Sequence, residues 1–302
     1  MATLAADAGM SSVRIDLGWP ALQPTPRRRI DPWAMRLADR CVDLARARGL
    51  DVLLTVLWTP AWASGNGELA APPRDLSSVA WFTGWLARHF RGRVGAYQIW
   101  NEPDQRRFWT GSIGDYVRLL RTAYGAIKSA DPRAKVVIAG TAHNNTPWIE
   151  AAYRAGARGA FDVMATHPYQ GLADAPPETA DPGTSWWLLT HVRAVHALMS
   201  AHGDGAKPIW FTEFGWSDHA NPPSPPAYRR GVRADVQGSY LVRTIRLLRA
   251  RFPYVRRAYW YKLASSPIDD AHEAGYGLLR QDLTPRPAYS MLKLFLRGQP
   301  SP

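Results

Sequence analysis

Short apolar runs alternate with longer amphipathic stretches along almost the whole chain. This alternation is typical of βα units, in which parallel strands are joined by crossover helices. The runs that predict strands are Val13–Leu17, Val52–Leu57, Ala96–Trp100, Lys135–Ala139, Phe161–Ala165, Pro208–Thr212 and Arg257–Tyr261. The pattern therefore predicts an α/β fold built on a mostly parallel sheet.

Helical periodicity fills the segments between these runs. In Asp31–Arg48, apolar residues recur at helical spacing from Met35 to Ala45, and Gly49 follows as a C-cap. The other predicted helices are Ser77–Phe90, Ile113–Ala130, Trp148–Ala155, Ser185–His202 and Ala234–Arg251. A chain of 302 residues can bury one large core. We therefore expect a single (β/α)8 TIM-type barrel over residues 1–302.

The predicted strands number seven, one fewer than such a barrel needs. The residues after Met1 predict a short helix of the kind that should follow the first strand. We expect a barrel that lacks its first strand or is truncated there, because the reading frame starts late. The alternative is a barrel that closes in a different way.

Composition narrows the class of protein. Hydrophobic residues make up 46% and charged residues 21% of the chain, as in ordinary globular proteins. No stretch approaches the roughly 18 apolar residues of a membrane span, so none is expected. The segment after Met1 also lacks the charged and apolar regions of a signal peptide. Cys41 is the only cysteine, which excludes an internal disulfide and a cysteine-based metal site.

Charge and aromatic content bear on possible partners. The net charge of +12 would suit an acidic partner such as nucleic acid or an acidic polysaccharide. However, Arg residues are scattered along the predicted helices, and the densest run, Arg27–Arg29, lies in a Pro-containing loop. We therefore expect a solvated surface and no nucleic-acid partner. The 14 Trp residues suit stacking on sugar rings, although Trp also fills cores.

Two of the six Glu residues directly follow or end apolar strand-like runs. Glu102 follows Ala96–Trp100 and Asn101, and Glu213 follows Pro208–Thr212. Strand C-termini of a parallel barrel converge on one face, where active sites lie. Glycoside hydrolysis requires one protonated carboxyl for the leaving oxygen and one ionised carboxylate near the anomeric carbon. The two positions therefore predict a carboxylate pair across the barrel mouth.

The neighbours of these residues form motifs. Trp100-Asn101-Glu102-Pro103 and Thr212-Glu213-Phe214-Gly215 match the acid/base and nucleophile motifs of glycoside hydrolase clan A. Further matches are Val13-Arg14-Ile15-Asp16, His167-Pro168-Tyr169 and Tyr259-Trp260-Tyr261. In motif order and spacing, the chain resembles glycoside hydrolase family 39 and the family 5-like cellulases from Leu4 to about Leu294. Family 5 relatives usually carry a His at the end of the third barrel strand. This chain has Leu57-Trp58-Thr59-Pro60 there, which favours family 39.

The resemblance implies a role for each matching residue. Glu102 is expected to be the catalytic acid/base, with a raised pKa in the free enzyme, and Glu213 the nucleophile. Arg14 resembles the arginine that hydrogen-bonds the nucleophile, and Asn101 the residue that holds the sugar 2-hydroxyl. The resemblance also implies a retaining mechanism.

Residues near the later strand ends are expected to contact sugar. His167 and Tyr169 resemble the pair that orients the nucleophile and touches the substrate. Trp260 resembles the platform under the sugar at the cleavage point, while Trp58 and Trp216 are predicted outer-subsite stackers. Trp62 and Trp109 could serve in the same way, and each of these outer residues could equally fill the core.

Other chemistries find little support in the sequence. The motifs of zinc proteases, phosphate-binding loops and serine hydrolases are absent, and the predicted mechanism needs no metal or cofactor. The predicted function is hydrolysis of β-linked polysaccharides or oligosaccharides. The alternatives are a transglycosylase, a non-catalytic carbohydrate-binding barrel, and an inactive fragment of a longer glycosidase. A monomer is favoured, and the resemblance favours a secreted or periplasmic location.

Overall fold

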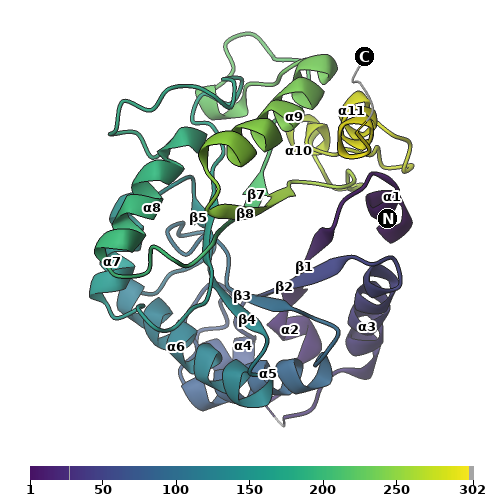
Figure 1. Cartoon of the computed structure of the whole chain (residues 1–302). Coiled ribbons are helices and arrows are strands. Elements are labelled where there is room, and N and C mark those ends of the chain that lie inside the picture. The colour runs from purple at the N-terminus through teal and green to yellow at the C-terminus, as the bar shows by residue number, and fades with distance from the viewer. Residues whose placement is uncertain (27, 299–302) are drawn as a thin grey trace.

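The computed structural model describes residues 1–26 and 28–298. Its strands are parallel and form two four-stranded sheets in sequential order. The first sheet contains β1 (Ser12–Gly18), β2 (Asp51–Leu57), β3 (Ala96–Ile99) and β4 (Lys135–Ile138), and the second contains β5 (Thr141–Ala142), β6 (Met164–His167), β7 (Ile209–Phe214) and β8 (Val255–Trp260). Figure 1 shows the strands curving around a common centre with helices outside them. The architecture is a TIM-type α/β barrel, as predicted.

The strands β4 and β5 are two parts of one run, separated only by Ala139 and Gly140. An isolated parallel bridge between Val137 and Val163 links the two sheets at this point. Each of the seven predicted strands therefore corresponds to one strand position. The predicted run Phe161–Ala165 begins too early, because the Asp162 carboxylate accepts the Val136 N–H at 2.8 Å ahead of β6.

Helices cover the outer surface of the strands. They are α1 (Ala2–Asp7), α2 (Trp19–Leu22), α3 (Pro32–Arg46), α4 (Ala61–Ser64), α5 (Leu76–His89), α6 (Ile113–Ala130), α7 (Thr146–Arg154), α8 (Val192–Ala201), α9 (Ala234–Arg251), α10 (Ala271–Gly275) and α11 (Pro287–Leu296). Local caps fix several starts: Asp31 accepts the N–H groups of Trp33 and Ala34, and Ser112 and Asp115 form a capping box. No described helix is long and apolar enough to cross a membrane.

The predicted helix Ser185–His202 is wrong at its start. A 3-10 turn (Leu189–His191) precedes α8, and Leu188 is extended. The Gln170 side chain accepts the Leu189 N–H at 3.0 Å, and Asn144 donates to the Leu188 carbonyl at 2.8 Å. These groups from distant parts of the chain occupy the backbone positions that an earlier helical turn would use.

Within the described residues, no strand ladder joins β1 to β8, so the barrel is open between them. Contacts between the two ends of the chain flank this opening. Asp7 at the end of α1 pairs with Lys293 of α11 at 2.7 Å and with Arg297 at 2.9 Å. On the strand side, Arg257 of β8 reaches Asp51 of β2 at 2.6 Å. Figure 1 shows α1 and α11 side by side at the opening.

The interior of the barrel changes from apolar to polar along the strands. A buried apolar cluster inside the barrel includes Leu53, Ala96, Ala165 and Trp210. Alternate residues of a strand face the same side. Two residues further along the same four strands stand Thr55, Gln98, His167 and Thr212, all buried. The strand pattern thus places a polar layer towards the C-terminal end, above a packed apolar one.

Candidate active site

Glu102 and Glu213 meet at the C-terminal end of the barrel. Glu102 lies three residues beyond the end of β3, and Glu213 lies within β7. One carboxylate oxygen of each, together with a ring nitrogen of His167, falls within a set of atoms that are all within 4.8 Å of one another. The side chain of Glu102 is 6% exposed and that of Glu213 is 14% exposed. The two carboxylates therefore face one small, largely desolvated space.

Two protein donors hold the Glu213 carboxylate. Arg14 Nη1 donates to Oε1 at 2.6 Å, and the Tyr169 hydroxyl donates to Oε2 at 3.0 Å. Burial lowers the pKa of Arg14, but the charges and hydrogen bonds of Glu213 and Asp16 together outweigh it and leave that pKa above its ordinary value. Burial, together with the charge of Glu213, raises the pKa of Tyr169 well above its ordinary value. Both groups therefore remain donors near neutral pH.

Arg14 also joins the strands around it. Its Nη1 donates to the Thr212 carbonyl at 3.0 Å, and its Nη2 donates to Asn101 Oδ1 at 2.8 Å. Its Nε donates to Thr55 Oγ1 at 2.8 Å. Because these partners lie on or beside β2, β3 and β7, one guanidinium of β1 fixes the relative position of three other strands.

His167 lies between the two carboxylates and is fully buried. Its Nδ1 is 2.9 Å from Glu102 Oε1 and 3.7 Å from Glu213 Oε2, and its Nε2 is 3.0 Å from Thr212 Oγ1. His167 and Tyr169 were expected to orient the same carboxylate, that of Glu213, but they contact different ones. Tyr169 bonds Glu213, whereas the nearer carboxylate of His167 is Glu102.

The Glu102 carboxylate has a second partner that the sequence analysis missed. Arg107 Nη2 donates to Oε2 at 3.0 Å. Burial raises the pKa of Glu102, but the hydrogen bond and charge of His167, followed by the charge of Arg107, lower it below its ordinary value. The predicted acid/base role calls for a raised pKa in the free protein, and the contacts with His167 and Arg107 act in the opposite direction. The sequence signal for Arg107 is its place in the same loop, five residues after Glu102.

Several residues just beyond the strand ends have strained backbone conformations. Trp58 (φ 70°), Trp100 (φ 77°), Glu102 (φ 40°) and His143 (φ 57°) are non-glycine residues with left-handed backbone conformations just beyond β2, β3 and β5. Such conformations are costly for residues with a Cβ and persist where the surroundings enforce them. Their positions follow the C-terminal face of the barrel, where the two carboxylates meet.

Gly140 creates the space for His167. A Cβ on Gly140 would stand 2.3 Å from His167 Nε2 and 2.9 Å from Thr212 Oγ1. The Gly140 carbonyl also accepts the Glu102 N–H at 2.9 Å. The break between β4 and β5 therefore lets the backbone approach His167 closely while it holds the backbone of Glu102.

The predicted aromatic contacts differ in exposure. Trp260 is partly exposed, its Nε1 donates to the Tyr276 carbonyl at 2.8 Å, and Phe214 packs against its ring. Trp58 is also partly exposed and stacks on Phe108 with ring centroids 5.5 Å apart. Trp216 is only 2% exposed and donates to the Ala175 carbonyl at 2.9 Å. Trp216 is buried beside Trp260, which agrees with the alternative that it fills the core.

The trio of Glu102, His167 and Glu213 has donor atoms close enough to be considered for a metal ion. Those atoms already have protein partners: His167 bonds Glu102, and Arg14 and Tyr169 bond Glu213. The guanidinium of Arg14 also places a fixed positive charge beside the trio, which disfavours a cation. The expectation that no metal or cofactor is needed stays a prediction.

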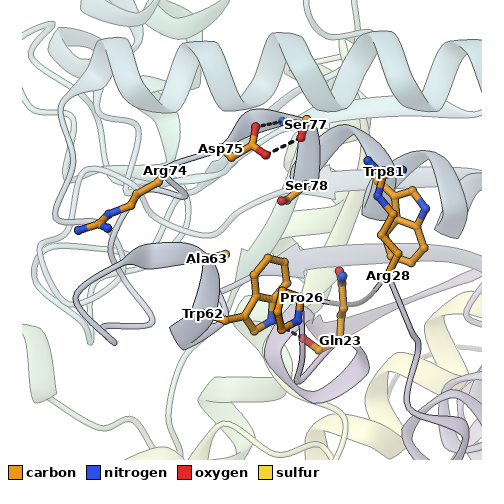
Figure 2. Close-up of a pocket in the computed structure, with 10 residues that line it drawn as sticks. All are labelled: Gln23, Pro26, Arg28, Trp62, Ala63, Arg74, Asp75, Ser77, Ser78 and Trp81. Carbon is orange, nitrogen blue, oxygen red and sulfur yellow. Dashed lines mark hydrogen bonds between the residues drawn. The ribbon is translucent and has the colours of Figure 1, made fainter.

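A separate cavity of about 350 Å³ lies between the loop after α2 and the start of α5. Figure 2 shows Trp62 and Trp81 among its lining residues, with Trp62 Nε1 donating to the Gln23 carbonyl at 2.9 Å. Neither Glu102 nor Glu213 lines this cavity. Trp62, considered above as an outer sugar contact, therefore lines a space distinct from the carboxylate pair.

Comparison with known families and curated proteins gives matches to glycoside hydrolases. A family model described as cellulase (glycosyl hydrolase family 5) matches residues 1–240. The curated β-xylosidase of Caldicellulosiruptor saccharolyticus is 24% identical over 281 residues, which cover 85% of this chain and 55% of that protein. The chain thus spans about half the length of this curated relative.

Solved structures agree on the fold. A family 39 glycoside hydrolase from Bacteroides cellulosilyticus has a TM-score of 0.79 at 22% identity, covering 97% of this chain and 59% of that one. A GH5_18 structure from Streptomyces cattleya, in complex with Manb1-4GlcNAc, has a TM-score of 0.71 at 21% identity, covering 100% and 76%. A monomeric β-xylosidase from Caulobacter crescentus has a TM-score of 0.66 at 19% identity, covering 97% and 63%. These likenesses show the TIM-barrel fold of clan A glycosidases.

Proposed function

Since the chain belongs to the cellulase family of glycosyl hydrolases, family 5, we propose that it is a retaining β-glycosidase with Glu102 as acid/base and Glu213 as nucleophile. The observation that carries the proposal is the carboxylate pair, with an oxygen of each within 4.8 Å. Retaining enzymes place their carboxyl groups about 5–5.5 Å apart, whereas inverting enzymes leave room for a water at about 6.5–9.5 Å.

In the first step, a Glu213 oxygen forms a bond to the anomeric carbon while the glycosidic C–O bond breaks. Glu102 gives its proton to the departing oxygen. In the second step, Glu102 takes a proton from water, the water oxygen bonds to the anomeric carbon, and the Glu213 carboxylate leaves. The anomeric configuration is inverted twice and so retained.

The contacts of Glu213 suit a nucleophile. Arg14 and Tyr169 together bond both carboxylate oxygens, which orients the group and favours its charged form. When charge leaves the carboxylate in the glycosyl-enzyme, these bonds weaken, and when it returns they strengthen. Arg14 and Tyr169 thus support departure of Glu213 in the second step as well as its ionisation before the first.

Sugar contacts are assigned to a side-chain donor without a protein partner among the described residues and to two partly exposed rings. Asn101 uses Oδ1 to accept from Arg14, and among the described residues its Nδ2 has no hydrogen-bond partner. We assign Nδ2 to the sugar 2-hydroxyl, a contact that strengthens in the transition state. Trp260 is assigned as the platform under the sugar at the cleavage point, and Trp58 as a stacking surface on the Glu102 side.

The proposed substrate is a β-linked oligosaccharide or polysaccharide, bound by one catalytic barrel over residues 1–302. The curated relative is a β-xylosidase, and one structural neighbour holds Manb1-4GlcNAc, so the relatives act on or bind different sugars. Secretion and a monomeric state stay predictions. Transfer to a sugar acceptor uses the same glycosyl-enzyme, and product analysis with excess acceptor would detect it.

The proposal is tested with a panel of activated aryl β-glycosides and β-glucans, read by NMR at the anomeric carbon. We expect a product with the β configuration formed first, whereas an α product would overturn the retaining mechanism. Binding without turnover by the wild-type chain would instead favour a non-catalytic carbohydrate-binding barrel.

The nucleophile is tested by Glu213→Ala. Turnover should fall by about 10⁴-fold or more, and azide should restore cleavage with an α-glycosyl azide as product. The matched control is Glu68→Ala, an exposed loop glutamate, which should keep wild-type rates. Absence of azide rescue in a folded Glu213→Ala protein would contradict the assignment.

A further inference from the structure

Arg107 occupies an unusual position for an exposed arginine. It lies in the loop between β3 and α6, and its Nη2 donates to Glu102 Oε2 at 3.0 Å. Its side chain is 72% exposed, whereas the side chain of Glu102 is 6% exposed. An exposed surface cation is therefore bonded to the buried carboxylate to which the acid/base role is assigned above.

The oxygen that Arg107 bonds is the one needed for proton transfer. Glu102 Oε1 is 2.9 Å from Nδ1 of His167, which is fully buried. Oε2, which faces the exposed Arg107, is therefore the oxygen of Glu102 left for a glycosidic oxygen. Arg107 occupies one lone pair of Oε2 and its charge favours the ionised carboxylate, so its departure makes it easier for Glu102 to hold and donate a proton there.

The surroundings of Arg107 indicate where it can move. Its guanidinium lies 4.7 Å from the centroid of the Phe108 ring, and Phe108 stacks on Trp58. Stacking on Phe108 can keep the cation near Glu102 after their hydrogen bond breaks, with its N–H groups free for another partner. Among the residues that the structure describes, Glu102 is the only carboxylate that pairs with Arg107. A second anion at this place would have to come from the substrate.

We propose that Arg107 is a specificity-determining residue for leaving groups that carry a carboxylate, such as an acidic sugar beyond the cleaved bond. The substrate carboxylate takes Arg107 from Glu102, and Glu102 is thereby released to accept a proton at Oε2 and act as the acid. Arginine matches a carboxylate with two parallel N–H···O bonds, so the new pair outcompetes the single bond to Glu102. The net charge of +12 favours the approach of such a substrate. The inference rests on the proposed function.

The exchange acts on the proton equilibrium of Glu102. The charge of Arg107 contributes to the lowered pKa of Glu102, so its departure raises that pKa towards the range an acid needs. The other charged or titratable groups around Glu102 are Glu213, His167, His143, Asp104 and Tyr169. They lie on other strands or on loops, and among the described residues the ion pair of Arg107 is with Glu102 alone.

The kinetic test compares two aryl β-glycosides of one sugar whose leaving phenols have matched acidity. One phenol carries a carboxylate and the other is neutral. We expect wild-type kcat/KM to favour the carboxylated substrate by about three- to tenfold, and Arg107→Met to abolish the preference. Arg106→Met, at an exposed neighbour with no ion pair among the described residues, should keep it. An equal preference in the wild type and Arg107→Met would overturn the proposal.

A second measurement does not depend on turnover. The chain has six Glu residues, so carboxyl-labelled glutamate gives a small set of NMR signals that can be titrated and assigned with Glu102→Gln. We expect the pKa of Glu102 to rise in Arg107→Met and to be unchanged in Arg106→Met. An unchanged pKa in Arg107→Met would overturn the coupling even in an active enzyme. If the pKa of Glu102 shifts as expected but no glycoside is turned over, the proposed function would be overturned instead.

Discussion

Arg14 Nη1 lies 2.6 Å from Glu213 Oε1, and the two side chains are only 8% and 14% exposed. Both partners of this ion pair have lost most of their hydration. Their attraction offsets that cost only if the hydrogen-bond geometry is good. The same guanidinium also reaches Asn101 and Thr212, so it relates both carboxylate-bearing strand ends to β1. Its shape, and not only its charge, should therefore matter.

The first prediction concerns Arg14→Lys. Lysine keeps the charge but cannot reach Glu213, Asn101 and Thr55 together, because it has one nitrogen in place of three. We expect kcat/KM to fall about 100-fold, and the free energy of unfolding to fall by about 1–3 kcal/mol. Aryl-glycoside kinetics and urea unfolding measure the two effects. Arg46→Lys, on the surface of α3, should change neither; near wild-type activity of Arg14→Lys would count against the geometric role.

The second prediction concerns Tyr169→Phe. The change removes the hydroxyl that donates to Glu213 Oε2 at 3.0 Å and leaves the ring in place. A hydrogen bond to a charged group contributes about 1.5–3 kcal/mol, so kcat/KM should fall about 10- to 100-fold. Single-turnover kinetics should show a slower first step. Tyr228→Phe, at a ring that is 64% exposed, serves as the control. A change in KM alone would indicate that Tyr169 only binds sugar.

The third prediction concerns Gly140→Ala. The added methyl would stand 2.3 Å from His167 Nε2, so the imidazole must move away from Thr212 and Glu102. We expect a loss of about 1–3 kcal/mol in the free energy of unfolding and at least about a tenfold loss in kcat/KM.

The control for this substitution is Gly125→Ala in the exposed part of α6, where nothing lies within 4 Å of the added atom. That change should stabilise the chain by about 0.5–1 kcal/mol and leave activity unchanged. Equal stability changes in the two variants, measured by thermal unfolding, would contradict the tight contact between Gly140 and His167.

The sequence predicted those features whose causes are local. Strand positions follow from apolar runs, and α6 and α9 have the predicted bounds, with a capping box at the start of α6 and helical periodicity along both. The start of α8 was wrong because Gln170 and Asn144, distant in sequence, bind its preceding backbone. Local pattern cannot reveal a backbone group taken by a remote side chain.

The same distinction applies to the site. Glu102 and Glu213 could be singled out because each has a motif at a strand end. Arg107 could not, since its contact with Glu102 depends on how the loop after β3 folds back. The sequence left Trp216 open between sugar stacking and core filling, because an aromatic residue just beyond a strand can point outward or into the core, and only packing decides. The role of Gly140 likewise depends on three strands meeting at His167.

The last prediction concerns Asp7, which links α1 to α11 beside the barrel opening. The hydrogen bonds from Lys293 and then from Tyr289 lower the pKa of Asp7 below its ordinary value of 3.8. Because the pKa of Asp7 is lower in the folded chain than in the unfolded chain, its carboxylate stabilises the fold at pH values above the ordinary pKa. This stabilisation is lost as the pH falls through the folded-state pKa. Asp7→Asn should therefore lower Tm at pH 7, and the difference from wild type should shrink below about pH 4. Thermal unfolding between pH 7 and pH 3 measures it, with Asp235→Asn, whose carboxylate bonds its near neighbour Arg233, as the control. A difference that stays constant over this range would show that the charge of Asp7 does not hold the two ends together.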